Sequence, residues 1–304
     1  MGATGEIGFV GTGNMGGPIA RRLLAAGHAV IACDARTEAL RGVLAAGASP
    51  AGSPREVASR CGVVFTALPG PREIEAVVTG EQGILAGASR GAIHVDLSTT
   101  SLASVKRLHA LEAAAGVSLV DAPVSGGAVA AEQGTLSVMA SGDRDAFLRV
   151  EPLLGAFAKS VFHLGGSGAG TLAKLVNNAI FLCAGLLAQE GFTVWTRAGF
   201  APARLLEVLK ASSGGMYAGL AELTLRRDFD NAFFTLALAE KDVALALDAA
   251  RSLDVPARVT EAAHGVYARA LAQGLGSQVF FATLRAIEAE AGIEIPRLEK
   301  WLEQ

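Results

Sequence analysis

The chain has 304 residues, of which 51% are hydrophobic and 18% are charged, and its formal net charge is −3. This length suits two domains of ordinary size, and this apolar content excludes a disordered chain. No block of Lys or Arg stands out, so nucleic acid is not an expected partner.

A glycine-rich turn follows the first apolar run, residues 7–10, which has the pattern of a buried parallel strand. Gly11, Gly13 and Gly16 form a G-x-G-x-x-G motif ahead of a helical pattern from Met15 to Ala26. The first glycine would permit a tight turn, the second would leave room for a pyrophosphate, and the third would let helix and strand pack closely. The cofactor-binding residues expected in this turn are Gly11, Thr12, Gly13, Asn14, Met15 and Gly16.

An acidic residue follows the glycine motif at the spacing of a dinucleotide-binding unit. Residues 29–34 have the pattern of a second strand, and Asp34 at its end lies about 20 residues beyond the motif. A carboxylate here accepts hydrogen bonds from a ribose 2′-hydroxyl and repels a 2′-phosphate, so Asp34 favours NAD over NADP. Thr37 is expected to cap the next helix, and Ser53 the one after it.

Strands alternate with helices as far as about residue 165, which predicts a Rossmann-type, doubly wound parallel sheet. The expected strands are 63–68, 93–97 and 117–121, with 136–140 and 161–164 as candidate extensions, and the clearest helix is 102–115. Ligands of such sheets bind at the carboxyl ends of the strands. Leu68, Pro69 and Thr99 therefore join the expected cofactor site.

The second part of the chain has no strand pattern. Helical patterns fill residues 171–198, 203–212, 238–253, 259–273 and 280–291. We therefore predict an α/β dinucleotide-binding domain over residues 1–165 and an all-helical substrate and oligomerisation domain over 166–304. Ala- and Leu-rich helical faces suggest association between subunits. Residues 214–217 are expected in a loop that could close over the substrate.

One lysine in the first of these helices is a candidate proton-transfer group. Lys174 and Asn178 are four residues apart and share a helical face. Leu172, Leu175, Val176, Ala179 and Ile180 are expected to surround them, and such an apolar setting would lower the pKa of the amine. A lysine nearer neutrality can take a proton from an alcohol or return one to a carbonyl. A lysine that only extends from a core helix to solvent is the alternative.

A run of small residues follows the strand at 117–121. Ser125, Gly126 and Gly127 can present successive backbone N–H groups as an anion-binding nest, with the Ser hydroxyl as a further donor. A structural Gly-Gly turn is the alternative. No G-x-S-x-G surrounds Ser125, so a hydrolase nucleophile is not expected there.

Four ordered motifs give the whole chain a resemblance to the β-hydroxyacid dehydrogenases, which include 3-hydroxyisobutyrate dehydrogenase and tartronate semialdehyde reductase. The motifs are the glycine turn, Asp121–Gly127 with Gly134-Thr135-Leu136, Gly168–Asn178, and Lys241-Asp242 at the head of a late helix. Ala130 stands where family members often have glycine, which makes the substrate harder to name.

The resemblance implies an NAD(P)-dependent oxidoreductase for a small 3-hydroxy acid or its semialdehyde. It makes Lys174 the general acid/base, assigns Ser125, Gly126 and Gly127 to the substrate carboxylate, and adds Asn177 and Asn178 as substrate ligands. Lys241 would bind the cofactor, although a solvated ion pair is its alternative. Arg36 and Thr37 resemble a turn found in NADP-dependent members, so the preference for NAD rests on Asp34.

Further expectations concern partners and compartment. The resemblance implies a homodimer or homotetramer. For the function, the alternatives to a hydroxyacid dehydrogenase are an imine reductase-like enzyme and a non-catalytic dinucleotide-binding protein of the same fold. Residues 175–189 are too short and polar to span a membrane. The first strand begins almost at the N-terminus, so no signal peptide is expected. Scattered histidines predict no metal site, and three unclustered cysteines suggest free thiols in the cytoplasm.

Overall fold

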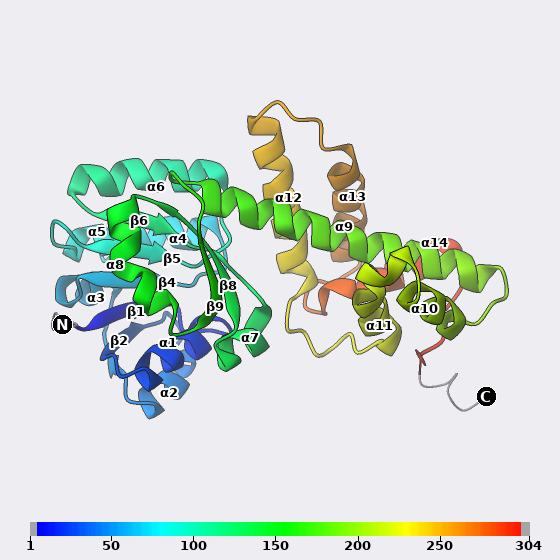
Figure 1. The fold of residues 1–304 in the computed structure, drawn as a ribbon, viewed down its shortest axis with the longest axis horizontal. Coiled ribbons are helices and arrows are strands. Elements are labelled where there is room, and N and C mark those ends of the chain that lie inside the picture. The colour runs from blue at the N-terminus through cyan, green and yellow to red at the C-terminus, as the bar shows by residue number, and fades with distance from the viewer. Residues whose placement is uncertain (1–4, 299–304) are drawn as a thin grey trace. The chain divides into compact units, whose positions relative to one another are not determined.

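The computed structural model describes residues 5–298 (Figure 1). The chain divides into two compact units, which meet inside one helix between Lys174 and Leu175. The first unit is built on a sheet and the second is all helical, as the sequence predicts. The domain boundary after residue 165 stays a prediction.

The first unit contains a nine-stranded sheet in the order β3-β2-β1-β4-β5-β6-β8-β7, with β9 beside β8. Its strands are β1 Ile7–Val10, β2 Val30–Cys33, β3 Ser49–Pro50, β4 Val63–Thr66, β5 Ile93–Asp96, β6 Ser118–Asp121, β7 Val124–Ser125, β8 Leu136–Gly142 and β9 Ala158–His163. The pairs from β3 to β6 are parallel, which confirms the doubly wound fold. Strand β8 runs antiparallel to β6 and β7, so the sheet is mixed at this edge, whereas a parallel sheet was expected.

Helices cover both faces of this sheet, because side chains alternate along each strand. Phe9 and Phe65 pack on one face with α1, α2 and α8, and Val10 and Val64 pack on the other with α3 to α6. The helices of the unit are α1 Gly16–Ala25, α2 Thr37–Ala45, α3 Pro54–Arg60, α4 Pro71–Thr79, α5 Ile84–Gly87, α6 Leu102–Ala115, α7 Gly127–Gln133 and α8 Arg144–Leu154.

Helix ends follow the capping rules at two sites and depart from them at a third. Ser53 accepts a hydrogen bond from the Glu56 N–H, and Ser101 accepts one from the Ser104 N–H. Thr37 does not cap α2, contrary to expectation, but is its first residue. The helix begins one residue early because the Asp34 carboxylate binds the Arg36 N–H and turns the chain there.

The second unit is formed by the later part of α9 Ala169–Arg197, together with α10 Pro202–Lys210, η1 Ser213–Tyr217, α11 Ala218–Arg226, α12 Leu236–Ser252, α13 Arg258–Ala272, η2 Phe280–Ala282 and α14 Thr283–Ala291. Phe192, Tyr267 and Phe280 lie in its core. Residues 214–217 belong to the 3₁₀ helix η1, not to an open loop as expected. The Gly215 N–H bonds the Ser212 carbonyl, so the glycine-rich sequence forms a tight helical turn.

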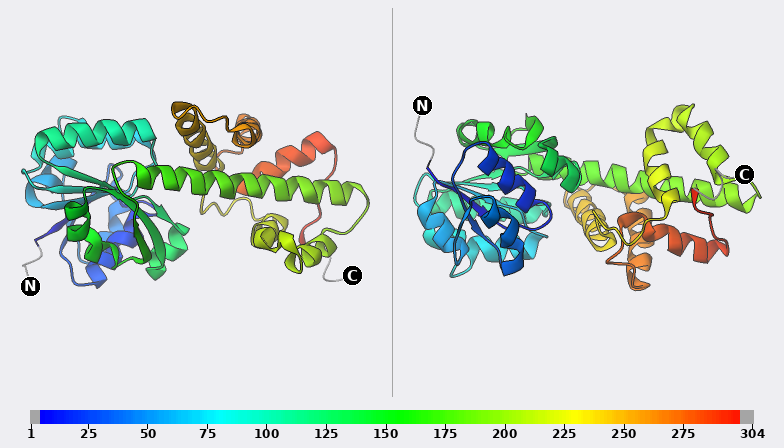
Figure 2. Two further views of the ribbon diagram at one scale, coloured as in Figure 1. Left: turned by 45° about the horizontal axis from the view of Figure 1, so that its top comes forward. Right: turned by 90° about the horizontal axis from the view of Figure 1, so that it is seen from below.

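Helix α9 is unbroken (Figure 2). It is longer than residues 175–189, the run expected to be too short to span a membrane. Its 29 residues include a stretch of mean hydropathy 1.6, which meets the length and composition of a membrane span, and 39% of that stretch is buried. Core helices meet the same criterion.

Candidate active site

The glycine turn lies where the strand order reverses, between β1 and β4. Gly11 has φ +89°, and a Cβ there would lie 2.4 Å from the Ala67 carbonyl oxygen. A Cβ at Gly16 would lie 1.9 Å from the Gly11 carbonyl oxygen, so α1 approaches β1 more closely than any other residue would allow. A Cβ at Gly13 would meet only the end of the Arg36 side chain, 3.3 Å from its Nη2. The turn is therefore a glycine-lined cradle that side chains would fill.

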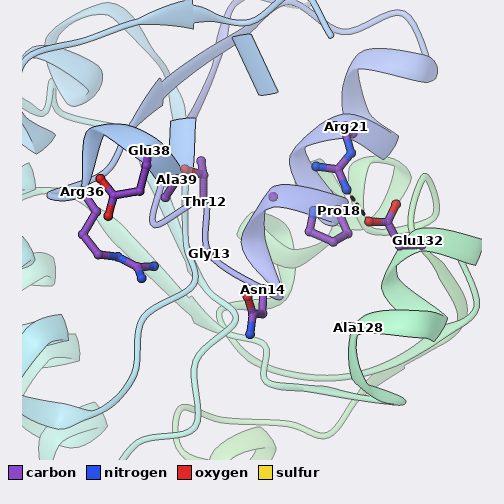
Figure 3. A pocket seen from close by; sticks show the side chains of 11 residues that line it. Thr12, Gly13, Asn14, Pro18, Arg21, Arg36, Glu38, Ala39, Ala128 and Glu132 are labelled. Atoms are coloured by element: carbon purple, nitrogen blue, oxygen red, sulfur yellow. Dashed lines mark hydrogen bonds and ion pairs between the residues drawn. The ribbon is translucent and has the colours of Figure 1, made fainter. Parts of the chain in front are cut away.

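A cavity of about 410 Å³ adjoins this turn (Figure 3). Thr12, Gly13 and Asn14 line one side, Arg21 extends from α1, and Arg36 extends from the N-cap of α2. Arg21 forms an ion pair with Glu132 of α7. Glu38 and Glu132 also line the cavity, so its charges are mixed, and its fit to the phosphates and ribose of a dinucleotide rests on the open space beside a glycine turn at the start of a helix.

Asp34 is held at the edge of this cavity by backbone donors. Its Oδ2 accepts from the Thr12 N–H at 2.7 Å, and its Oδ1 accepts from the Arg36 N–H at 2.9 Å. The Arg36 guanidinium lies 3.9 Å from Oδ1 and is largely exposed. The carboxylate thus has a fixed orientation beside the glycine turn, whereas most of the Arg36 side chain is exposed to solvent.

The loops after β4 and β5 complete this edge of the sheet. The Leu68 side chain reaches the glycine turn, since its Cδ2 would lie 2.9 Å from a Cβ at Gly11. The Leu68 N–H donates to the Ser98 hydroxyl at 2.9 Å, which joins the two loops. Pro69 follows Leu68, and Thr99 follows Ser98 with a partly buried side chain. The loop residues assigned to the cofactor therefore lie beside one another.

The run Ser125-Gly126-Gly127 forms the junction between β7 and α7. Gly126 and Gly127 have φ of +129° and +71° and are exposed, and Ser125 is partly buried. The two positive φ values turn the chain sharply, so that Gly127 begins the helix α7, which was not expected from the sequence. The exposed backbone at this junction is consistent with either a nest or a structural turn.

The start of α9 is fixed by a buried carboxylate at the end of β6. Asp121 accepts four hydrogen bonds, from the Ser141 hydroxyl, the Gly168 N–H, and the N–H and hydroxyl of Thr171. Burial raises the pKa of Asp121 although these donors lower it. Lys174 follows Thr171 by one helical turn.

Lys174 and Asn178 share one face of α9, as expected, and both are buried, with exposed fractions of 8% and 7%. Asn177 is exposed, and its amide donates to the Asn178 side-chain oxygen. Val176 and Ile180 do not surround the lysine, contrary to expectation. Their exposed fractions are 51% and 63%, because residues two and six positions further along lie on another helical face.

In the helical unit, Asn178 is held by Asp242, a residue for which the sequence indicates no separate role. The Asn178 Nδ2 donates to the Asp242 Oδ2 at 2.7 Å, and Lys241 Nζ lies 2.9 Å from the Asp242 Oδ1. Asp242 is buried. Lys241 does not open its helix, contrary to expectation. Thr235 caps α12, so Lys241 lies in the second turn, where Asp242 faces α9.

The chain is an NAD(P)-binding protein of the dehydrogenase type, by its glycine turn at the reversal of a doubly wound sheet and its helical second unit. A family model for the NAD binding domain of 6-phosphogluconate dehydrogenase matches residues 6–165. A second model, described as NAD-binding of NADP-dependent 3-hydroxyisobutyrate dehydrogenase, matches residues 168–287.

Relatives match almost the whole chain. The 2-(hydroxymethyl)glutarate dehydrogenase of Eubacterium barkeri is 33% identical over 95% of this chain and 97% of its own. The NAD-dependent L-serine dehydrogenase of Pseudomonas aeruginosa is 32% identical over 94% and 99%. The structure of Mycobacterium tuberculosis 3-hydroxyisobutyrate dehydrogenase with L-serine matches at a TM-score of 0.83 and 29% identity, over 94% and 99% of the two chains.

The chain belongs to the β-hydroxyacid dehydrogenase family. It is accordingly an NAD(P)-dependent oxidoreductase that acts on the CH–OH group of a small hydroxy acid or forms it from the semialdehyde. These relatives do not favour the two alternatives, an imine reductase-like enzyme and a non-catalytic protein.

Proposed function

We propose that Lys174 is the general acid/base of this dehydrogenase, that the substrate is a small 3-hydroxy acid, and that NAD is its preferred cofactor. The observation that carries the proposal is the pairing of Lys174 with Asn178, two buried polar groups on one face of α9. Burying an amine and an amide has a cost that a functional site can justify, and their spacing of one helical turn lets both reach one bound substrate.

The residues of the glycine turn, with Asp34 and the loops at Leu68 and Thr99, would hold the dinucleotide. The bound nicotinamide supplies the hydride acceptor or donor, which no side chain can replace. Lys241 is a further cofactor ligand in this proposal, and its ion pair with Asp242 would orient it.

The protein's own groups handle the proton and the carboxylate. In oxidation, the Lys174 amine takes the hydroxyl proton as the carbinol C–H bond breaks and the C=O bond forms, and in reduction it returns that proton to the carbonyl oxygen. Asn178, held by Asp242, would donate to the substrate oxygen, with Asn177 beside it. The N–H groups and hydroxyl of Ser125, Gly126 and Gly127 would bind the substrate carboxylate.

The preference for NAD rests on Asp34. Its carboxylate is fixed by two backbone N–H groups, so it cannot turn away from a 2′-phosphate. Asp34→Asn should therefore shift the ratio of kcat/KM values toward NADP, since the exposed Arg36 could then approach the phosphate. An unchanged ratio would remove Asp34 from the ribose site.

A homodimer or homotetramer is also part of the proposal. Val176, Ile180, Leu187 and Val194 are exposed on α9, at spacings of four, seven and seven residues. This spacing places them in one stripe along the helix, as in the seam of a coiled coil. Buried free thiols at Cys33 and Cys61 suit a cytoplasmic protein.

The test is a set of initial rates with NAD and NADP against small hydroxy acids, which should include 3-hydroxyisobutyrate, glycerate, 4-hydroxybutyrate, threonate and serine. Lys174→Ala should lower kcat about 10²- to 10⁴-fold with one of them, while cofactor affinity is kept. Lys159→Ala, a change of an exposed lysine on β9, is the matched control. A Lys174→Ala enzyme as active as the wild type would refute the assignment.

A further inference from the structure

A chain of buried polar side chains crosses the face of the sheet that α6 covers. It begins at an ion pair between Glu112 of α6 and His94 of β5, both with exposed fractions of 0%. The His94 Nδ1 lies 3.0 and 3.1 Å from the two Glu112 carboxylate oxygens, and its Nε2 lies 2.9 Å from the Thr66 hydroxyl of β4. An apolar helix–sheet contact would be the ordinary arrangement here, because buried ion pairs seldom add stability.

The chain continues from Thr66 to the edge of the sheet. The Thr66 hydroxyl donates to the Asp96 Oδ1 at 2.8 Å, and the Ser98 hydroxyl donates to the same oxygen at 2.6 Å. The Ser98 oxygen in turn accepts the Leu68 N–H at 2.9 Å. A continuous series of contacts therefore joins Glu112, deep under α6, to the backbone of the loop after β4.

The donors and acceptors along this chain have one consistent direction. Thr66 gives its only proton to Asp96, so its oxygen must accept the proton on the His94 Nε2. The Glu112 carboxylate then requires a proton between itself and the His94 Nδ1. Burial alone lowers the pKa of His94, but Glu112 and, less strongly, Asp96 more than offset it, and the pKa of His94 is raised. The proton on the His94 Nε2 thus sets the direction of the Thr66 hydroxyl.

The end of the chain lies against the glycine turn. Leu68 is fixed at its backbone by Ser98, and its side chain borders Gly11, where an added Cβ would meet the Leu68 Cδ2 at 2.9 Å. A shift of this loop would move the wall of the cradle in which the dinucleotide is proposed to bind.

We propose that Glu112, His94, Thr66, Asp96 and Ser98 form a positioning relay that holds the Leu68 loop in its cofactor-binding conformation. The proposal rests on the cofactor site assigned above and adds residues that touch neither cofactor nor substrate. His94 and Glu112 lie at the far end, so they act only through Thr66 and Asp96.

Two variants break the relay at different places. Ser98→Ala removes the acceptor of the Leu68 N–H, and the double variant His94→Leu/Glu112→Leu replaces the ion pair by apolar groups of similar bulk, which the fold should tolerate. Val150→Ala, in α8 on the other face of the sheet, is the control for a general loss of stability. The measurements are amide hydrogen exchange at Leu68, the dissociation constant of the reduced dinucleotide by fluorescence, and kcat and KM for the cofactor.

Both relay variants should exchange the Leu68 amide faster than the wild type. Ser98→Ala should raise the dissociation constant about fivefold, the effect of one net hydrogen bond, and the double variant should raise it by a smaller factor. The cofactor KM should rise in parallel, with kcat within about twofold. Val150→Ala, compared at an equal loss of Tm, should leave exchange and affinity unchanged.

Unchanged Leu68 exchange and affinity in both relay variants would overturn the proposal, and so would equal changes in Val150→Ala. A response confined to Ser98→Ala would overturn the positioning role proposed for His94 and Glu112. A wild-type protein that binds neither NADH nor NADPH would overturn the proposed function and this inference together, whereas binding by the wild type with unaffected variants would overturn the inference alone.

Discussion

Asp121→Asn is the substitution whose cost the structure defines most closely. Each carboxylate oxygen of Asp121 accepts one backbone N–H, from Gly168 or from Thr171, at 3.0 Å. An asparagine has one acceptor oxygen, so its NH₂ group must face one of these two N–H groups, and a backbone donor cannot turn away. A buried unsatisfied donor costs about 1–3 kcal/mol, and the lost charge-assisted bond adds about 1 kcal/mol.

Part of this cost is offset, because burial disfavours the ionised form of Asp121, as its raised pKa shows, and the neutral amide avoids that penalty. The expected net loss is about 2 kcal/mol of unfolding free energy, or about 4–8 °C in Tm. Lys174 lies one turn into the helix held by Asp121, so kcat should fall roughly 10- to 100-fold as the amine is displaced.

The assay is thermal unfolding together with steady-state rates. Asp145→Asn, a change of an exposed carboxylate in the first turn of α8, is the matched control and should alter stability by no more than about 0.5 kcal/mol. If Asp121→Asn is as stable as Asp145→Asn and retains the wild-type kcat, the carboxylate does not hold α9 and the reasoning fails.

Three further predictions concern the cradle, the buried ion pair and the exposed stripe. Gly16→Ala should weaken dinucleotide binding in fluorescence titrations at least tenfold, because its Cβ would lie 1.9 Å from the Gly11 carbonyl, and wild-type affinity would contradict this. The pKa of His94 is raised above its unfolded value of about 6.5, so its stabilising contribution is complete below that pH and is lost as the pH rises through the folded pKa. Denaturant unfolding from pH 6 to 10 should therefore show the wild type losing stability relative to His94→Leu/Glu112→Leu, and parallel curves would argue against the ion pair. Ile180→Lys should convert an oligomer to monomers in light scattering, and an unchanged mass would exclude this stripe as the interface.

Much of the fold was predictable because its signals are local. The run 7–10 and the helix 102–115 have the bounds expected from sequence, since Glu6 and Gly11 border the apolar run and Ser101 and Gly116 border the helix. Helix α7 was missed because Gly126 and Gly127, at its start, have the composition of a turn. The antiparallel direction of β8 depends on which strands it meets, and side-chain alternation carries no information on direction.

The candidate site divides in the same way. The shared face of Lys174 and Asn178 follows from helical periodicity alone, and their burial agrees with it. The bond from Asn178 to Asp242 joins residues 64 apart, so no local pattern could show it. The expected strand 93–97 starts at the same residue as β5, so the sequence places His94 correctly in a strand. Its partner Glu112 lies on α6, and the position of that helix over β5 depends on how the whole sheet is packed.

Helix α9 also bears on how chimaeras of this protein could be made. The division between the compact units falls inside this helix, between Lys174 and Asn178, where a crossover would take the amine from one parent and the amide from the other. The segment 164–168 ahead of α9 is the better junction, because it keeps both groups on one parental helix. A junction there is crossed by the hydrogen bonds of Asp121, so the donor of the sheet unit must supply that aspartate and the donor of the helices must supply a threonine at position 171.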